Sequence, residues 1–141
     1  MSKIIASAAI RGAHKILERA EKKYKEALAR NHRLTRKEGL DATFAKHKLD
    51  ALIAPSGGPA WPIDLVNGDA GGFGSSSACA VSGYPHVTVP AGYFRGLPLG
   101  LSFMGLPWSE GKLIRMAFAF EAATKARKPP RFLPSADLAS T

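Results

Sequence analysis

The stretch Tyr84–Gly105, YPHVTVPAGYFRGLPLGLSFMG, decides the fold of this chain. Two apolar runs, His86–Ala91 and Leu97–Met104, flank the turn Phe94-Arg95-Gly96. Apolar runs of this length, separated by a short Gly-containing turn, predict a β-hairpin. We therefore expect the two runs to be neighbouring strands of a small sheet.

A third strand is predicted upstream of the hairpin. Residues 49–55, LDALIAP, form a short apolar run that Pro55 ends, which is typical of a strand buried on both faces, with residues 50–54 in the sheet. The segment 56–75 that follows holds six Gly and two Pro. Loops of this length inside a compact domain are usually functional or mobile. Residues 76–84 predict a short helical turn before the hairpin.

Two helices are predicted at the N-terminus. Residues 14–31 carry apolar side chains at three- and four-residue spacing, which places them on one helix face. A capping box at residues 35–38, Thr-Arg-Lys-Glu, predicts a second helix over 36–47 that buries Leu40 and Phe44. The link at 32–34 is short, which favours a pair that folds back on itself. The apolar face of the first helix consists of Ile16, Ala20, Tyr24, Ala27 and Leu28.

A C-terminal helix is predicted after the hairpin. Ser109 is its expected N-cap, and Pro129-Pro130 ends it. Its buried positions are expected to be Leu113, Met116, Ala117, Phe120 and Ala123. The expected fold class is therefore α/β, with an N-terminal helical pair, a small mixed sheet with a hairpin, and a C-terminal helix.

The chain is basic, with a formal net charge of +9, and residues 1–50 carry 13 Lys/Arg against 6 Asp/Glu. Such a region is either a patch for nucleic acid or a solvated helix face. No aromatic or Gly-rich RNA motif accompanies the charge, so we expect no nucleic-acid partner. No apolar run reaches the ~18 residues of a membrane span, so no membrane partner is expected. One cysteine excludes an intramolecular disulfide and fits a reducing, cytoplasmic location.

The serines at 75–77 are the nearest approach to a nucleophile motif. Gly74-Ser75-Ser76-Ser77-Ala78 loosely matches a nucleophile elbow, for which His86 is the conceivable base. The elbow needs a strand that leads directly into the serine, and here a Gly-rich loop precedes it. Serines that cap a helical turn are therefore the favoured interpretation.

The remaining reactive side chains do not form a recognisable centre. The histidines at 14, 32 and 47 lack metal-ligand spacing, so no metal and no cofactor are expected. Cys79 lies between alanines and is expected to be a structural thiol. Asp64 and Asp69 either cap turns or bind a substrate amine, and turn capping is favoured.

Four sequence blocks occur in an order that resembles a known enzyme family. They are LDALIAPSGGPAWPIDLVNGD at 49–69, SSSACAVSGYPHVTVPAG at 75–92, GLPLGLSFMG at 96–105, and the last helix with KARKPPRFLP at 125–134. Together they resemble the C-terminal part of amidase-signature hydrolases, which cut amide bonds with a Ser–cis-Ser–Lys triad. On this basis residues 21–136 form the amidase C-terminal region, 1–20 an unplaced N-terminal segment, and 137–141 a tail.

The resemblance also implies a binding site. In that family a mixed sheet is flanked by helices, the strand at 49–55 runs in the core, and the loop after it helps to form the acyl pocket of the substrate. The implied substrate-binding residues are Ser56, Gly57, Gly58 and Trp61. The implied substrate of the intact parent is a small-molecule amide.

The family's catalytic segment does not occur in this sequence. A GGSSGGS-type nucleophile stretch and its upstream lysine are both missing, and GGFGSSS at 71–77 belongs to the C-terminal blocks by its flanks. We therefore expect no catalytic residue here and an inactive chain: a truncated product, a subunit or a fragment. Its expected partner is the missing N-terminal portion or a second copy. The alternative is a non-enzymatic interaction domain that uses the basic helical face.

Overall fold

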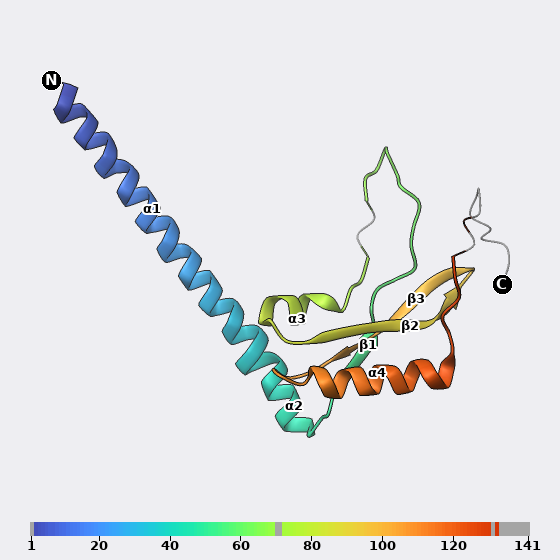
Figure 1. The fold of residues 1–141 in the computed structure, drawn as a ribbon. Coiled ribbons are helices and arrows are strands. Elements are labelled where there is room, and N and C mark those ends of the chain that lie inside the picture. Colours follow the sequence, from blue (N-terminus) through green and yellow to red (C-terminus); the bar gives the residue numbers. More distant parts are fainter. Residues whose placement is uncertain (1, 70–71, 131, 133–141) are drawn as a thin grey trace.

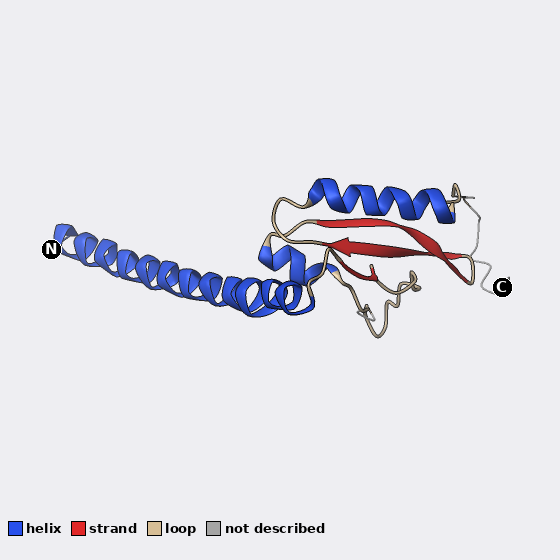
Figure 2. Ribbon diagram, turned by 90° about the horizontal axis from the view of Figure 1, so that it is seen from below, coloured by secondary structure: helices blue, strands red, loops and turns tan. Residues whose placement is uncertain are grey.

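The computed structural model describes residues 2–69, 72–130 and 132. A long helical rod at the N-terminus leads into a small sheet, with α4 along one face and shorter helices toward the other (Figures 1 and 2). In chain order the elements are α1 (Ser2–His32), the π-helical segment η1 (Arg33–Leu40), α2 (Asp41–His47), β1 (Leu52–Pro55), α3 (Ser76–Ser82), β2 (His86–Phe94), β3 (Leu97–Met104) and α4 (Glu110–Thr124).

The predicted hairpin is confirmed. Strands β2 and β3 pair antiparallel, with Val87 opposite Phe103. The two turn residues have positive φ, 50° at Arg95 and 75° at Gly96. A two-residue turn of that kind matches the right-handed twist of the strands it joins, and glycine accepts the conformation most easily.

The sheet has the order β1-β3-β2, and its strands pair antiparallel throughout the described residues. The α/β class is confirmed, but the mixed pairing we expected is not present, because β1 and β2, on the two sides of β3, both run antiparallel to it. Strand β1 is consequently an edge strand and is not buried on both faces as predicted. Ile53 lies opposite Phe103, yet its side chain is 63% exposed.

The predicted fold-back of the N-terminal helices is wrong. Residues 32–34 remain helical, and the Asp41 N–H donates to the Arg36 carbonyl, which is one residue further back than in an α-helix. The capping box is not formed either, because the Thr35 hydroxyl donates to the Asn31 carbonyl at 2.7 Å and Glu38 pairs with Arg33 at 2.8 Å. No glycine or proline interrupts residues 31–34, so nothing in the local sequence ends the helix.

The core consists of two clusters on opposite faces of β3. Consecutive strand residues point to opposite faces, so Phe103 and Met104 belong to different clusters. One cluster joins α4 to the hairpin: Val89, Phe103, Leu113 and Ala117. The other joins α2 and α3 to the far face of the sheet: Leu40, Phe44, Cys79 and Met104.

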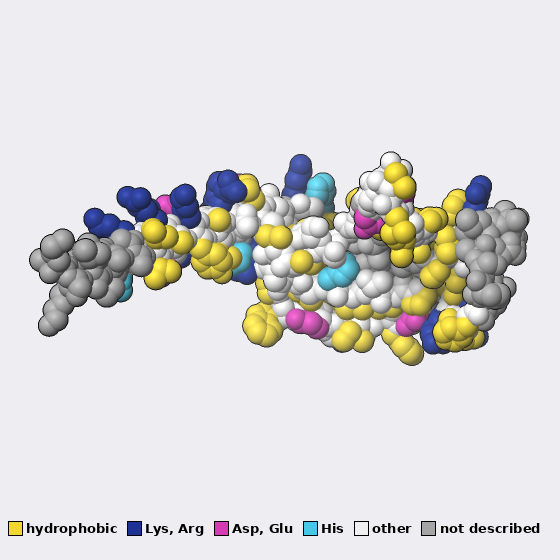
Figure 3. Space-filling view, turned by 90° about the horizontal axis from the view of Figure 1, so that it is seen from above, with side chains coloured by type: hydrophobic (Ala, Val, Ile, Leu, Met, Phe, Trp, Pro, Cys, Tyr) yellow, Lys and Arg dark blue, Asp and Glu magenta, His cyan; other side chains and the backbone are white. Residues whose placement is uncertain are grey.

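The apolar face predicted on the first helix forms but is uncovered. Ile16 and Tyr24, two residues of that face, are 68% and 66% exposed. Figure 3 shows hydrophobic side chains along one side of the projecting helix and Lys and Arg along another. The helix is internally supported by ion pairs between Lys25 and Glu21 and between Lys22 and Glu26, which are weak at exposed positions.

Candidate functional site

The loop at 56–75 is closed at its base by the sheet. The Ser56 N–H donates to the Gly100 carbonyl at 2.8 Å, which extends the β1–β3 ladder by one residue. The Ser75 N–H donates to the Ser56 carbonyl at 3.2 Å, and Gly57 forms an antiparallel bridge with Gly74. The two ends of the loop therefore lie side by side.

Three hydroxyl groups meet at the base of this loop, and we call them the hydroxyl cluster. Ser56 Oγ lies 2.7 Å from Ser102 Oγ and 3.3 Å from Thr88 Oγ1, and the Ser102 and Thr88 hydroxyls are 3.1 Å apart. Ser102 is fully buried. Because Thr88 and Ser102 alternate with Val89 and Phe103, the cluster lies on the sheet face opposite α4.

A glycine makes room for the hydroxyl cluster. A Cβ on Gly100 would lie 2.7 Å from Ser56 Oγ, closer than real Cβ atoms approach, and 3.0 Å from Thr88 Cγ2, which is tighter than most real contacts. Sequence reasoning singled out Ser56 but missed Thr88, Ser102 and Gly100. The only local signal was the alternation of a hydroxyl residue with an apolar one in each strand of the hairpin.

The two candidate glycines have different surroundings. A Cβ on Gly57 would lie 3.2 Å from the Phe73 carbonyl oxygen, so the backbone there passes close to the returning half of the loop. A Cβ on Gly58 would meet nothing within 4 Å. Gly57 is thus fixed by its neighbours, whereas Gly58 borders open space.

Trp61 belongs to a separate part of the loop. Its indole N–H donates to Asp69 Oδ1, and its side chain is 45% exposed. A hollow of about 330 Å³ is lined by residues from one stretch of the loop: Trp61, Pro62, Asp64, Asn67, Gly68 and Asp69. The structure therefore brings Ser56 and Gly57 together at the sheet and places Trp61 apart from them, beside the hollow of the loop.

Asp64 organises the turn that shapes this hollow. One oxygen of its carboxylate accepts the N–H groups of Val66 and Asn67 at 2.9 Å each, and the other accepts the Asn67 side-chain amide. These donors, led by the Asn67 backbone N–H, hold the pKa of Asp64 below its ordinary value. The turn-capping interpretation of Asp64 is therefore confirmed.

The serines at 75–77 do not form a catalytic triad. Ser75 Oγ lies 3.5 Å from His86 Nε2, the outer limit of a hydrogen bond, and no side chain among the described residues orients the other nitrogen of His86. Ser76 and Ser77 are exposed. Ser75 occupies the N-cap position of α3, but its hydroxyl makes no capping hydrogen bond.

Other reactive groups outside the loop match their structural interpretation. Cys79 is buried, and burial raises the pKa of its thiol, which makes it unreactive. No group of three potential metal-ligating side chains occurs within residues 2–69, 72–130 and 132. None of the helices described there has the length and apolar composition to cross a bilayer.

Comparisons with known proteins agree in pointing to one group of enzymes. No family model matches the chain. A probable amidase of Arabidopsis thaliana is 42% identical over 112 residues, which is 79% of this chain and 19% of the plant protein. The native peptide amidase from Stenotrophomonas maltophilia is 52% identical with a TM-score of 0.70, over 77% of this chain and 22% of that one. The peptide amidase bound to the competitive inhibitor chymostatin is 54% identical with a TM-score of 0.74, over the same shares.

These similarities cover most of this chain but little of its relatives, because the chain spans about a fifth of their length. An identity above half, together with a shared fold, goes well beyond a likeness of architecture alone. The chain is therefore homologous, over this segment, to amidases of the amidase-signature family.

Proposed function

We propose that this chain is the C-terminal segment of an amidase-type hydrolase, whose intact parent cleaves the C–N bond of a small-molecule amide. The observation that carries the proposal is the 52–54% identity to peptide amidase along three quarters of the chain, with a matching fold. The four sequence blocks that resemble the family include β1, β3, most of β2 and most of the loop at 56–75.

In this proposal the loop at 56–75 borders the acyl pocket. Ser56, Gly57, Gly58 and Trp61 are the proposed substrate-binding residues. The hydroxyl cluster supports this role because it fixes the rotamer of Ser56, and a fixed polar group at the start of a loop suits substrate positioning. Open space beside Gly58 gives a substrate access to the backbone.

None of the described residues is proposed as catalytic. Covalent amide hydrolysis requires an activated nucleophile and donors for the oxyanion, and the Ser75–His86 pair lacks an orienting third group. We infer that the Ser–cis-Ser–Lys unit comes from the part of an amidase that this sequence does not contain, and that this chain alone is inactive.

The exposed apolar surface supports a partner. The apolar face of α1 lies open, and the edge strand β1 leaves Ile53 in water. Each large apolar side chain left exposed forgoes roughly 1.5–3 kcal/mol of burial. We infer that these surfaces pack against the remainder of an amidase or, in its absence, against a second copy, and that the chain alone is marginally stable.

An activity assay on the purified chain tests the first part of the proposal. Aliphatic amides, aryl amides and peptide amides should show no turnover, since loss of a comparable triad costs on the order of 10⁶-fold in rate. Ser75→Ala and Ser76→Ala chains serve as controls. Turnover that either substitution abolishes would contradict the proposal and establish the serines as nucleophiles.

A chimera tests the second part. The segment of S. maltophilia peptide amidase that aligns with this chain is replaced by the corresponding residues of this chain. We expect an active enzyme, in which Trp61→Ala or Ser56→Ala raises KM more than it lowers kcat. Lys22→Ala, on the exposed side of α1, is the matched control. A folded chimera without activity, or one in which all three variants behave alike, would contradict the assignment of the site.

A further inference from the structure

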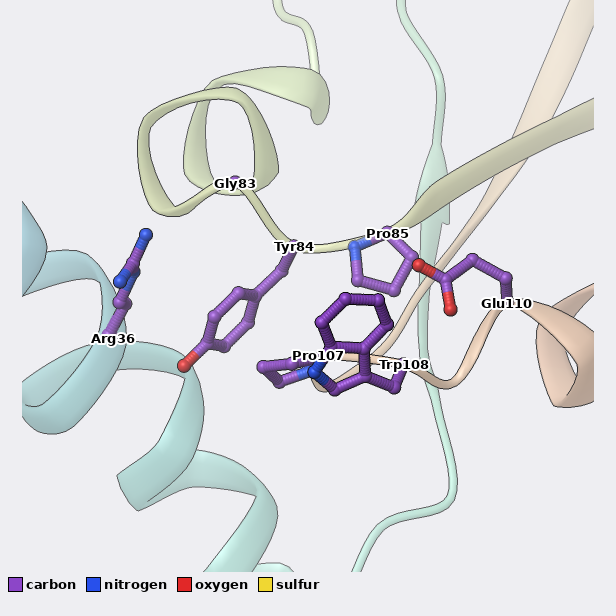
Figure 4. Close-up of a pocket in the computed structure, with 7 residues that line it drawn as sticks. All are labelled: Arg36, Gly83, Tyr84, Pro85, Pro107, Trp108 and Glu110. Atoms are coloured by element: carbon purple, nitrogen blue, oxygen red, sulfur yellow. The ribbon is translucent and has the colours of Figure 1, made fainter.

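A second cavity, of about 200 Å³, lies outside the loop at 56–75 (Figure 4). It forms where η1, the end of α3 and the link between β3 and α4 meet. Its lining consists of Arg36, Gly83, Tyr84, Pro85, Pro107, Trp108 and Glu110. We call it the Trp108 pocket. Two aromatic rings and two proline rings form most of this lining, and one carboxylate stands at its rim.

Trp108 is held in a conformation that costs free energy. Its side chain is 93% exposed, and its backbone has a φ of 63°, in the left-handed region. Bulky residues rarely adopt this region, so the turn at Trp108 is strained. The turn that imposes the strain is tied by Ser109, whose hydroxyl donates to the Leu106 carbonyl at 2.6 Å. An indole held open to water by a strained turn is a natural contact for a ligand.

The opposite wall of the Trp108 pocket is rigid. The Tyr84 hydroxyl donates to Asp41 Oδ1 at 2.8 Å. Arg36 stacks over the Tyr84 ring at 5.8 Å, and its Nε donates to the Ser82 carbonyl at 2.7 Å. Since the Arg36 charge is already placed over Tyr84, the free cation-binding face of the pocket is Trp108.

Glu110 supplies the matching negative charge. It is exposed in the first turn of α4, and Figure 4 shows its carboxylate beside Pro85 and Trp108. An aromatic face next to a carboxylate attracts a guanidinium or ammonium group. Grooves lined by aromatic and proline rings accept the ridged surface of a polyproline II segment. The lining therefore fits a short segment that is both basic and rich in proline.

The chain itself carries such a segment at 125–130, Lys-Ala-Arg-Lys-Pro-Pro. Arg127, Pro129 and Pro130 are exposed. The segment is anchored far from the pocket, because the Lys128 N–H donates to the Tyr93 hydroxyl at 3.0 Å and its ammonium lies over the Tyr93 ring at 5.1 Å. The length of α4, about 22 Å for its 15 residues, separates the two sites within one molecule (Figure 1).

We propose that the Trp108 pocket binds segment 125–130 of a second copy of this chain. Arg127 of that copy pairs with Glu110 and stacks on Trp108, while its two prolines pack between Pro85 and Pro107. Pocket and segment lie near opposite ends of α4 and are different surfaces, so the contact is heterologous and joins copies head to tail.

A peptide titration tests the pocket. A fluorescein-labelled peptide with the sequence of 125–130 is titrated with the full chain. Each protein preparation is first checked for folding, because buried Cys79 reacts slowly with a thiol reagent only in the folded chain. We expect a Kd on the order of 10⁻⁴ M. Trp108→Ala should raise the Kd more than tenfold, and Glu110→Gln two- to fivefold. Trp61→Phe, in the other hollow, should leave it unchanged. A peptide that binds the Trp108→Ala chain equally well, or a peptide with both prolines replaced by alanine that binds as tightly, would overturn the proposal.

Sedimentation equilibrium tests the head-to-tail contact. A Trp108→Ala chain keeps its segment and loses its pocket, whereas a Pro129→Ala/Pro130→Ala chain keeps its pocket and loses its segment. Each of these two variants alone should associate at least tenfold more weakly than the unaltered chain. An equimolar mixture of the two should form a heterodimer, since one variant supplies the pocket and the other the segment. Association that neither variant weakens would overturn this contact and would leave the proposed packing through α1 and β1 standing.

Discussion

Substitution of Gly100 by alanine is the most direct test of the hydroxyl cluster. The new methyl group would lie 2.7 Å from Ser56 Oγ, 3.0 Å from Thr88 Cγ2 and 3.1 Å from Ser56 Cβ. Ser56 cannot retreat freely, because its N–H is bonded to the Gly100 carbonyl and its hydroxyl to Ser102. Either Ser56 leaves the sheet face or the edge strand β1 shifts away from β3.

The magnitude follows from three effects. Overpacking at a confined site costs about 1–3 kcal/mol. Loss of the Ser56–Ser102 hydrogen bond adds about 0.5–1.5 kcal/mol, since Ser102 is fully buried and keeps only Thr88 as a partner. The lower chain entropy of alanine in the unfolded state returns about 0.4–1 kcal/mol. The expected net loss in the free energy of unfolding is about 0.5–4 kcal/mol, or roughly a 2- to 900-fold change in the opening equilibrium.

Labelling of Cys79 measures this loss even if global unfolding is shallow. The thiol is 3% exposed, so a reagent reaches it only through opening, and the labelling rate reports the opening equilibrium. Gly58→Ala is the matched control, with no atom within 4 Å of the new carbon and an expected change within about 0.5 kcal/mol. Adding Ser56→Gly to Gly100→Ala should recover the overpacking part. Equal labelling rates for Gly100→Ala and Gly58→Ala would refute the packing of Ser56 against β3.

Three further predictions rest on a few side chains. Burial raises the pKa values of Cys79 and Tyr84 above their ordinary values of 9.0 and 10.0, and at Tyr84 the hydrogen bond to the Asp41 carboxylate adds to this effect. The free energy of unfolding should therefore be at its full value below about pH 9 and decline as the pH rises further. Urea unfolding midpoints measured against pH test this, and Tyr84→Phe should make the decline smaller. Phe44→Ala should cost about 3–5 kcal/mol and abolish cooperative melting by circular dichroism, whereas Phe118→Ala, 71% exposed, should melt like the unaltered chain. Asp64→Ala should speed proteolysis within 56–75. Because the pKa of Asp64 is lowered, the loop of the unaltered chain should resist proteolysis above pH 3.8 and lose that resistance as the pH falls below this value.

Local patterns predicted the hairpin correctly and α4 in part, because α4 ends at Thr124, before the expected Pro129-Pro130, and Ala123, expected to be buried, is exposed. Arg95-Gly96 supplied a turn that glycine makes possible, and the flanking apolar runs gave both strands nearly to their ends. Leu113 and Ala117, one helical turn apart, predicted the buried stripe of α4. These elements were predictable because their partners are close in sequence and their signals are backbone preferences or short-period patterns.

Features that depend on distant partners were not predictable. Apolar residues on α1 correctly indicated a helix, but only the three-dimensional arrangement shows that nothing among the described residues covers them. The sequence at Thr35 matches a capping box, but the helix continues through this position. An uninterrupted helix has no free backbone N–H groups there for a cap to bind, so the Thr35 hydroxyl bonds to the Asn31 carbonyl instead. Sequence likewise predicted an apolar strand at β1 without its position in the sheet, and an edge position leaves Ile53 exposed.

The candidate site also combines a residue that the sequence identified with partners that only the fold brings near it. Ser56 was identified by resemblance, but the residues that fix it, Thr88, Ser102 and Gly100, lie more than thirty positions further along the chain. Ser102 is buried because β1 brings Ser56 across it. The base of the loop at 56–75 is therefore only as well ordered as the pairing of β1 with β3. In an active chimera, Gly100→Ala should for this reason raise both KM and the fraction of molecules in which β1 is unpaired from β3. A change in KM without loss of β1 pairing would contradict the idea that the hydroxyl cluster positions substrate by holding β1 in place.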